Sequence, residues 1–314
     1  MTDEPADTSE TETDVASDAT PTELTSTELT STELTPTELT PAELTPTELT
    51  SEPAPEVVDR GVVGWGELVM LLDNKDRRYL ITLERDREFH SHAGYVSHSE
   101  IVGSPEGSTV ASTRGANYRV FRPTLSDFVF KMPRGAQVIY PKDLGPILML
   151  ADIGPGMKVL ESGVGSGALS MAMLRCGADI TGYEIREEFA NRAQINVERF
   201  LGTDAMRNYR VELRDCYEGI DERGVDRVVL DLPEPWQVAP HAAVALRPGG
   251  IILGYSPSIT QVIQFRDSLS ANGFVMAETL EVMNRGWYIE GQAVRPDHRM
   301  VGHTGFLTTA RRGS

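Results

Sequence analysis

The sequence predicts an α/β protein with a mainly parallel sheet, preceded by a small antiparallel β domain and an acidic tail. Three observations lead to this prediction. Apolar strand-like runs alternate with helical stretches after Pro155, short β-rich runs broken by turns come before it, and the chain opens with a repeated polar pentapeptide. Strand–helix alternation is typical of a parallel sheet with helices on both faces. We expect a tail over residues 1–58, a β domain over 59–130, and an α/β domain over 131–314 whose connector spans 131–155.

The tail is expected to be disordered. Residues 21–50 are six pentapeptides, PTELT, STELT, STELT, PTELT, PAELT and PTELT, each with a single leucine. A five-residue period matches neither helix nor strand, and so little apolar surface cannot offset the chain entropy that folding removes. Two interpretations stay open: an acidic tether or solubility tail, and a tolerated expansion without a role.

The net charge of the chain comes from this tail. The formal charge is −18, but residues 1–59 hold 16 acidic residues and no Lys or Arg, which leaves 31 acidic and 29 basic residues for the other 255. The charge of the body therefore neither supports nor excludes an RNA partner. Two cysteines are too few for a disulfide framework, and no apolar run reaches about 18 residues, so we expect a cytoplasmic protein without a membrane span.

The β domain is predicted from four β-rich runs separated by Gly, Asn-Lys-Asp and Ser-Pro-Glu-Gly turns. The runs are "GELVMLLD", "RRYLITL", "EFHSHAGYVSH" and "YRVFRPT". Short strands with such turns favour an antiparallel arrangement. His90, His92 and His98 lie close together in sequence, but Gly94 interrupts the run, so we expect no metal site there.

The α/β domain is expected to hold seven strands. They are predicted at 157–162, 179–184, 209–213, 225–231, 249–255, 274–283 and 303–310. Helices are predicted over 167–176, 186–201 and 258–273. An open α/β sheet binds its ligand beyond the carboxyl ends of its strands, so functional residues are sought there.

A glycine-rich turn, "ESGVGSGA", follows the first of these strands. Glycine permits positive φ and lets a ligand approach the backbone closely. Gly163, Gly165 and Ala168 satisfy the dinucleotide fingerprint G-x-G-x-x-A. Glu161 with Gly163, Gly165 and Gly167 equally satisfies the acid-then-glycine pattern of methyltransferases that use S-adenosylmethionine. The turn alone does not decide between them, and a purely structural turn is a third possibility.

Acidic residues follow the next three strands. Glu184 lies 21 residues beyond Gly163, where a carboxylate accepts hydrogen bonds from ribose hydroxyls in either class, or is a solvated strand end. Asp215 is placed to meet an adenine amino group or to cap a helix. Asp231 precedes "LPEPW", a loop stiffened by two prolines, in which Trp236 offers a flat face for a planar base. The later "LRPGGIILGYSPS" is a turn and strand frequent at this place in methyltransferases. A nicotinamide enzyme would instead need a hydride-transfer site, and no obvious second domain supplies one.

With these residues in place, the chain resembles the TrmI type of tRNA (adenine-N1)-methyltransferase, which modifies position 58 of the T-loop. The resemblance covers about residues 61–310. Its stretches are "RRYLITL", "GYVSHSEIVG", "RPTLSDFVFKMPRGAQVIYPKDLGPIL", "VLESGVGSGALS", "YEIREEFANRAQINVE", "VVLDLPEPW", "LRPGG", "SPSITQV" and "RPDHRMVGHTGFL". "QVIYPKD" and "HRMVGHTGFL" are more specific than the glycine turn. The tail has no counterpart in the family pattern. "LPEPW" differs from the Asp/Asn-Pro-Pro-aromatic signature of amino-group methylases, and this difference fits a ring nitrogen as the target.

The resemblance implies a Rossmann-like class I fold, a homotetramer, tRNA as the partner, S-adenosyl-L-methionine as the only cofactor, and no metal. It implies that Ser162 to Ser166 hold the methionine end of the cofactor and Glu184 its ribose. The residues expected to contact the cofactor are Gln137, Ser162, Gly163, Val164, Gly165, Ser166, Glu184, Phe189, Asp215 and Asp231.

Asp231 is the expected catalytic residue. Neutral adenine carries a lone pair on N1, so catalysis depends on positioning and electrostatics rather than on a general base. The carboxylate can accept a hydrogen bond from the exocyclic amine and favour the cationic product. The base must leave the folded T-loop at a cost of a few kcal/mol. Residues expected to offset that cost by stacking or phosphate contacts are Trp287, Tyr288, Arg295, His298, Arg299 and His303.

Several alternatives stay open at this stage. The histidines can serve ordinary loop hydrogen bonds, and the arginines a solvated face. Tyr140 and Lys142 either line the site or pack the connector. The β domain either grips tRNA or stabilises subunit contacts. Another substrate on the same fold, or a non-catalytic tRNA-binding subunit, are the competing functions; the intact glycine turn, Glu184 and Asp231 count against the second.

Overall fold

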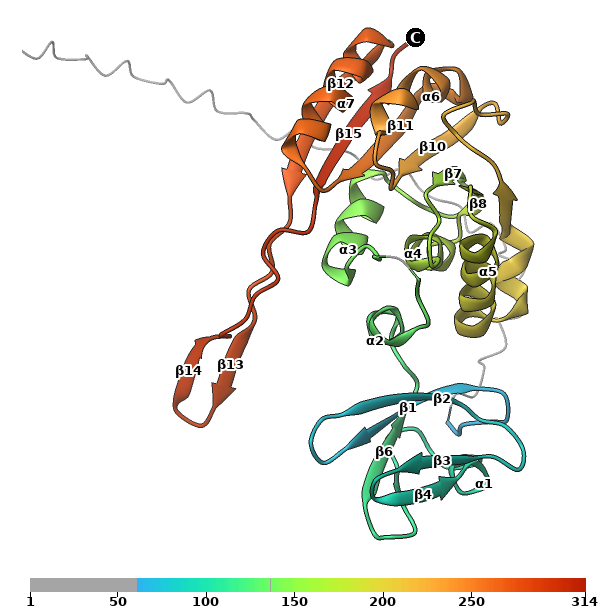
Figure 1. Ribbon diagram of the computed structural model, residues 1–314, viewed down its shortest axis with the longest axis vertical. Helices are drawn as coiled ribbons and strands as arrows, with labels where there is room; N and C mark the ends of the chain where they lie inside the picture. The colour runs from blue at the N-terminus through green and yellow to red at the C-terminus, as the bar shows by residue number, and fades with distance from the viewer. Residues whose placement is uncertain (1–60, 136) are drawn as a thin grey trace, which may run out of the picture. The chain divides into compact units, whose positions relative to one another are not determined.

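A computed structural model describes residues 61–135 and 137–314 (Figure 1). The predicted disordered tail and its repeats lie outside the described residues. The domain boundaries drawn from the sequence also stay predictions.

The first described part is antiparallel, as predicted. A four-stranded sheet has the order β2-β1-β6-β5, and β3 pairs with β4 in a separate hairpin. The elements are β1 (Leu68–Asp73), β2 (Arg78–Thr82), β3 (Glu88–Ser91), β4 (Gly94–Ser97), α1 (His98–Ile101), β5 (Thr109–Ala111) and β6 (Asn117–Phe121). Val69, Leu71 and Tyr118 are buried in a core of their own. His90 contacts Glu88, His92 contacts Arg77, and His98 accepts from the Glu84 amide, so the three histidines have separate partners.

The second part is a seven-stranded sheet with the order β12-β15-β11-β10-β7-β8-β9. The strands are β7 (Lys158–Ser162), β8 (Asp179–Glu184), β9 (Tyr209–Leu213), β10 (Val225–Leu230), β11 (Leu246–Ser256), β12 (Phe274–Glu281) and β15 (Phe306–Arg312). The pairs from β9 to β11 are parallel, and β15 is antiparallel to both of its neighbours. The seven predicted strands and the mainly parallel sheet are confirmed.

Helices cover both faces of this sheet. They are α2 (Leu125–Lys131), α3 (Pro141–Leu150), α4 (Ala168–Arg175), α5 (Glu187–Leu201), α6 (Ala239–Ala245) and α7 (Ile259–Ala271), with 3-10 turns η1 (Thr203–Asn208) and η2 (Pro235–Gln237). Ser258 starts α7 through a capping box with Gln261. Successive strand residues enter different cores: Val159 packs into one and Leu160 into the other. Because each such side chain contributes about 1.5–3 kcal/mol when buried, both faces stabilise the sheet.

The strand order places the ligand crevice. The chain runs from β7 outward to β8 and β9, then returns to the other side of β7 as β10. The carboxyl ends of β7 and β10 therefore flank a topological switch point, where open α/β sheets bind ligands.

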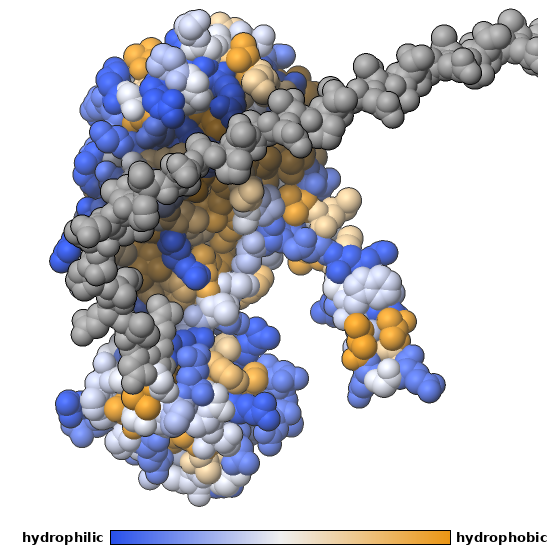
Figure 2. Space-filling model, turned by 180° about the vertical axis from the view of Figure 1, so that it is seen from behind, coloured by the Kyte–Doolittle hydropathy of each residue, from blue (hydrophilic) through white to orange (hydrophobic). Residues whose placement is uncertain are grey.

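A segment that we call the arm, residues 282–305, joins β12 to β15. It contains a hairpin of β13 (Trp287–Glu290) and β14 (Ala293–Pro296), which form a separate two-stranded sheet (Figure 1). Trp287, Ile289 and Val294 are 58%, 70% and 60% exposed. Figure 2 shows hydrophobic side chains gathered on this hairpin. Within the part of the chain that the structure describes, no helix is long and apolar enough to cross a membrane.

Candidate cofactor and target site

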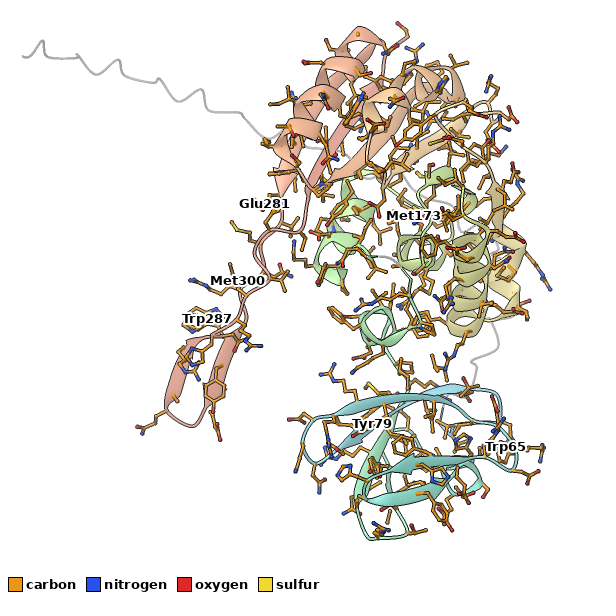
Figure 3. All side chains as sticks on the ribbon, in the orientation of Figure 1. Trp65, Tyr79, Met173, Glu281, Trp287 and Met300 are labelled. Atoms are coloured by element: carbon orange, nitrogen blue, oxygen red, sulfur yellow. The ribbon has the colours of Figure 1, made fainter. Side chains whose placement is uncertain are left out.

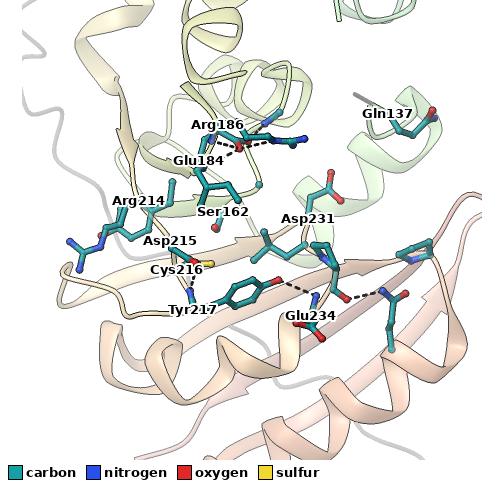
Figure 4. Close-up of a pocket in the computed structure, with 18 residues that line it drawn as sticks. Gln137, Ser162, Glu184, Arg186, Arg214, Asp215, Cys216, Tyr217, Asp231 and Glu234 are labelled. Carbon is teal, nitrogen blue, oxygen red and sulfur yellow. Dashed lines mark hydrogen bonds and ion pairs between the residues drawn. The ribbon is translucent and has the colours of Figure 1, made fainter. Parts of the chain in front are cut away.

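A cavity of about 630 Å³, which we call the first cavity, opens at the carboxyl ends of β7, β8 and β10. Residues predicted to bind the cofactor line it: Gln137, Ser162, Gly163, Gly165, Glu184, Asp215 and Asp231. Figure 4 shows Asp231 between Gln137 and Ser162 in this view. The structure therefore brings together residues from five separate stretches of the chain.

The glycine turn packs directly against the end of β10. Gly163 has φ +86°, and a Cβ on it would lie 2.1 Å from the Asp231 carbonyl oxygen. The Asp231 amide donates to the Ser162 carbonyl at 2.9 Å, which holds the two strand ends together. Only glycine fits at position 163. Ser166 is buried, and its Oγ has no hydrogen-bond partner among the described residues. The turn thus leaves a buried polar atom free for a ligand.

Glu184 is a fixed acceptor at the end of β8. Its Oε2 accepts from the Gly165 amide at 3.0 Å, and its Oε1 accepts from the Ile185 and Arg186 amides, both at 3.1 Å. The side chain is buried yet borders the first cavity. These bonds hold the carboxylate in one orientation before any ligand arrives.

Glu161 lies beneath the turn. Ser170 Oγ donates to its Oε2 at 2.6 Å, and Tyr209 donates to Ser170 Oγ at 3.1 Å. Burial, with smaller contributions from neighbouring carboxylates, raises the pKa of Glu161 to about 8. At neutral pH this carboxyl is therefore mainly uncharged, and it supports the turn from inside.

Asp231 borders both of the larger cavities. Besides the first, it lines a second cavity of about 410 Å³ with Tyr140, Tyr255, Pro257 and His303. Burial and then the charge of the neighbouring Glu184 raise the pKa of Asp231 to about 7. Its carboxylate has no hydrogen-bond donor among the residues that the structure describes. A cation in the first cavity would favour the ionised form of this acid.

The loops after β9 and β10 form the rest of the wall. Asp215 Oδ1 accepts from the Tyr217 amide at 2.9 Å, so Asp215 shapes a turn as well as facing the cavity. Gln261 donates to the Pro233 carbonyl at 2.7 Å and fixes the "LPEPW" loop. Trp236 lines neither cavity: it lies in η2, which packs on α7, and its carbonyl accepts from Ser268. The sequence-based interpretation of Trp236 as a stacking face is not supported.

Comparison with known proteins decides the family. A family model described as the tRNA methyltransferase complex GCD14 subunit matches residues 118–294, and a TrmI-like N-terminal model matches residues 61–110. The tRNA (adenine(58)-N(1))-methyltransferase TrmI of Thermus thermophilus is 35% identical over 253 residues, which cover 80% of this chain and 98% of the relative. The chain belongs to the TrmI family. A TrmI of Methanocaldococcus jannaschii, named for adenines 57 and 58, is also 35% identical, over 269 residues that cover 77% of this chain and 94% of the relative.

Solved structures agree on the TrmI fold. The crystal structure of tRNA (m1A58) methyltransferase TrmI from Aquifex aeolicus has a TM-score of 0.70 at 27% identity and covers 81% of this chain and 99% of that one. A Thermotoga maritima structure described as a SAM-dependent O-methyltransferase has a TM-score of 0.76 at 30% identity, with 81% and 96% covered. The chain therefore has the class I methyltransferase fold.

The remaining predicted residues lie outside the two main cavities of this TrmI-family chain, with one exception. Val164 and Ser166, within the turn, line a minor cavity of about 20 Å³ that Asp231 also borders. Phe189 is buried beneath the Arg186 guanidinium, 3.7 Å from its ring centroid. The residues predicted to contact substrate from the arm, which line neither cavity, are Trp287, Tyr288, Arg295, His298 and Arg299. The exception is His303, which lines the second cavity.

Sequence reasoning missed several residues that line the two cavities. Tyr255, Pro257 and Thr304 line the second cavity, and Cys216 and Tyr217 line the first. The available signal was position: Tyr255 and Pro257 flank the carboxyl end of β11, at the same edge of the sheet as Asp231. Of the two residues left open, Tyr140 lines the second cavity and Lys142 packs against Asp143.

Proposed function

We propose that this chain transfers the methyl group of S-adenosyl-L-methionine to N1 of adenine 58 in the tRNA T-loop, with Asp231 at the target base. The observation that carries the proposal is the place of Asp231, whose carboxyl borders both cavities. A methyl donor in the first cavity and a base in the second would meet at this residue. The names of the TrmI relatives support the choice of substrate.

The first cavity fits the cofactor. The bare turn at Gly163 suits the methionine end, and Glu184 presents fixed oxygens to the ribose hydroxyls. The unpartnered Ser166 Oγ belongs to the same turn and lies at the adjoining minor cavity. Asp215 lies where the adenine would be, Gln137 faces the cavity, and Phe189 supports the wall from beneath. When bound, the cofactor supplies an electrophilic methyl group on a positively charged sulfonium.

Asp231 acts as an acceptor rather than as a base. Adenine N1 attacks with its own lone pair, so the carboxylate receives a hydrogen bond from the exocyclic amine. That bond strengthens as positive charge develops on the base, which is the condition for electrostatic catalysis. The second cavity, walled by Tyr140 and Tyr255, would hold the base after it leaves the T-loop.

The arm is proposed to serve both tRNA binding and assembly. On one face of the hairpin Arg295 lies over the Tyr288 ring at 4.4 Å, a pair suited to a base and a phosphate. His298 and Arg299 follow β14 on the stretch that leads back to β15, which we call the returning leg of the arm. A two-stranded hairpin is at best marginally stable alone, so we propose a homotetramer in which a neighbouring subunit covers the opposite, apolar face. We also propose a cytoplasmic location and no metal requirement.

Incubation of the full chain with an unmodified tRNA transcript and labelled cofactor tests the proposal. Nucleoside mass spectrometry should show 1-methyladenosine, and mass spectrometry of nuclease fragments should map it to position 58. The fragment masses also report whether adenine 57 is modified. An O-methylated product, or labelling that persists without tRNA, would instead establish another substrate on this fold.

A further inference from the structure

Both ring nitrogens of His303 face hydrogen-bond acceptors. Nδ1 lies 2.6 Å from Glu281 Oε1, and Nε2 lies 2.7 Å from the Pro257 carbonyl oxygen. A neutral imidazole has one N–H, whereas the imidazolium has two. A carboxylate and a backbone carbonyl only accept hydrogen bonds, so neither can donate one to the ring. The two contacts are satisfied together only when the His303 ring is doubly protonated.

The surroundings favour this charged form. The Pro257 carbonyl and the Glu281 carboxylate raise the pKa of His303. The nearby Lys142 opposes them, but its Nζ is paired with Asp143 at 2.8 Å. The His303 ring also packs against the Phe306 ring, with 4.9 Å between the two ring centroids.

The three bonded residues come from three parts of the fold that meet at the root of the arm. Glu281 ends β12, His303 lies on the returning leg, and Pro257 joins β11 to α7 (Figure 3 labels Glu281). Pro257 also lines both cavities. The bond from His303 therefore connects the arm to the boundary between the two cavities.

A second charged group, the Lys142–Asp143 pair, contacts both legs of the arm, that is, the stretch that leaves β12 and the stretch that returns to β15. Lys142 Nζ donates to the Val282 carbonyl at 2.6 Å, and Thr304 donates to Asp143 Oδ2 at 2.7 Å. This pair attaches the legs to α3 but does not reach Pro257. Thr304 also bonds Tyr255 at the end of β11, whereas the bond from His303 is the one that reaches Pro257 among those recorded in the described part of the chain.

We propose that His303, as an imidazolium, is a positioning residue: it locks the root of the arm to Pro257 and so sets the cavity beside Asp231 for the base. The inference rests on the proposed function. It also assigns His303 a role other than direct contact with tRNA, because neither ring nitrogen remains free. Loss of the ring proton breaks one of the two bonds, and the arm or Pro257 then shifts.

The test compares pH profiles of kcat/KM for tRNA. In the wild type this value should fall at alkaline pH with one ionisation. His303→Gln should be about tenfold lower or more, without that ionisation, because one amide cannot satisfy both acceptors. In Glu281→Gln a neutral ring can donate to Pro257 and accept from the new amide. That variant should therefore stay within about threefold of the wild type and lose its alkaline fall.

His90→Gln, a change of the same kind on exposed β3, is the control and should keep the wild-type profile. Cofactor Kd should stay within about threefold in every variant, which separates positioning from damage to the cofactor site. An alkaline fall that persists unchanged in Glu281→Gln would overturn the proposal.

A measurement independent of activity completes the test. The chain has six histidines, so [15N]histidine labelling gives a small set of ring signals, and loss of one in His303→Gln identifies it. That ring should be an imidazolium at pH 7.5, where a free histidine is only about one-tenth protonated. A neutral His303 at that pH would refute the inference. If no variant methylates any tRNA, the proposed function fails, while this measurement still decides the state of His303.

Discussion

Asp231→Asn should stabilise the fold and abolish most of the activity. The fold raises the pKa of Asp231 from its ordinary 3.8 to about 7. The unfolded chain therefore releases this proton more readily than the folded one. Stability falls as pH rises from about 4 to about 7, and the whole loss is present above pH 7. Asparagine cannot ionise, so the Asp231→Asn variant does not lose this stability as the pH rises.

The size of the effect follows from the same values. A rise to about 7 corresponds to about 4 kcal/mol when the carboxyl is fully ionised. Because the group borders two cavities that admit water, we expect about 1–2 kcal/mol. Thermal unfolding should show Asp231→Asn melting a few degrees above the wild type at pH 8, with a smaller difference at pH 5.

Activity should move in the opposite direction. Loss of the charge at the base should lower kcat by about 10²–10³-fold. Cofactor affinity supplies a further readout, because a bound cation favours the ionised acid. The wild type should bind the cofactor more tightly at pH 8 than at pH 6, whereas the cofactor affinity of Asp231→Asn should not change over this range. The reasoning is refuted if the variant is no more stable than the wild type at pH 8, or if it methylates tRNA at the parental rate.

Three further predictions concern other parts of the site. Gly163→Ala should weaken cofactor binding about tenfold or more in calorimetry, because its Cβ would lie 2.1 Å from a carbonyl oxygen, whereas Gly165→Ala, with nothing nearer than 3.9 Å, should cost clearly less. Glu161→Gln should bind cofactor within about twofold of the wild type at pH 7, since a carboxyl with a pKa of about 8 is already uncharged there; a large loss would show that its charge is used. Trp287→Ser with Ile289→Ser should reduce the mass measured by light scattering, and an unchanged mass would place the subunit contacts elsewhere.

Local patterns in the sequence predicted the sheet. Val159 and Leu160 enter opposite cores, so the middle of β7 reads as consecutive apolar residues rather than as an alternation, and the same holds for Val228 to Leu230 in β10 and for Ile252 and Leu253 in β11. The position of Glu184 and Asp231 at strand ends followed from the rule that parallel strands present their carboxyl ends at one edge. Asp231 and Ser162 do meet there, through a backbone hydrogen bond.

Features that depend on distant contacts could not be predicted in this way. The connector was left without secondary structure, yet it holds α3, whose Lys142 bonds a carbonyl 140 residues away. The second cavity combines residues from Gln137 to Thr304, and no local period links them. His303 was predicted from the sequence to contact substrate and lines the second cavity, but its two acceptors lie 22 and 46 residues away, so its bonding could not be deduced.

The backbone bond between Asp231 and Ser162 has a consequence for how such an enzyme can change its target. Ser162 and Asp231 stand at the ends of neighbouring strands of one ladder and both face the first cavity, so the interval between the proposed donor turn and the proposed target acid is set by an interstrand spacing of about 4.8 Å. Loops and the hairpin can diverge to capture another nucleic acid without disturbing that interval. On the proposed function, the reaction distance belongs to the hydrogen-bonded sheet, and the capture of the substrate to the loops and the hairpin.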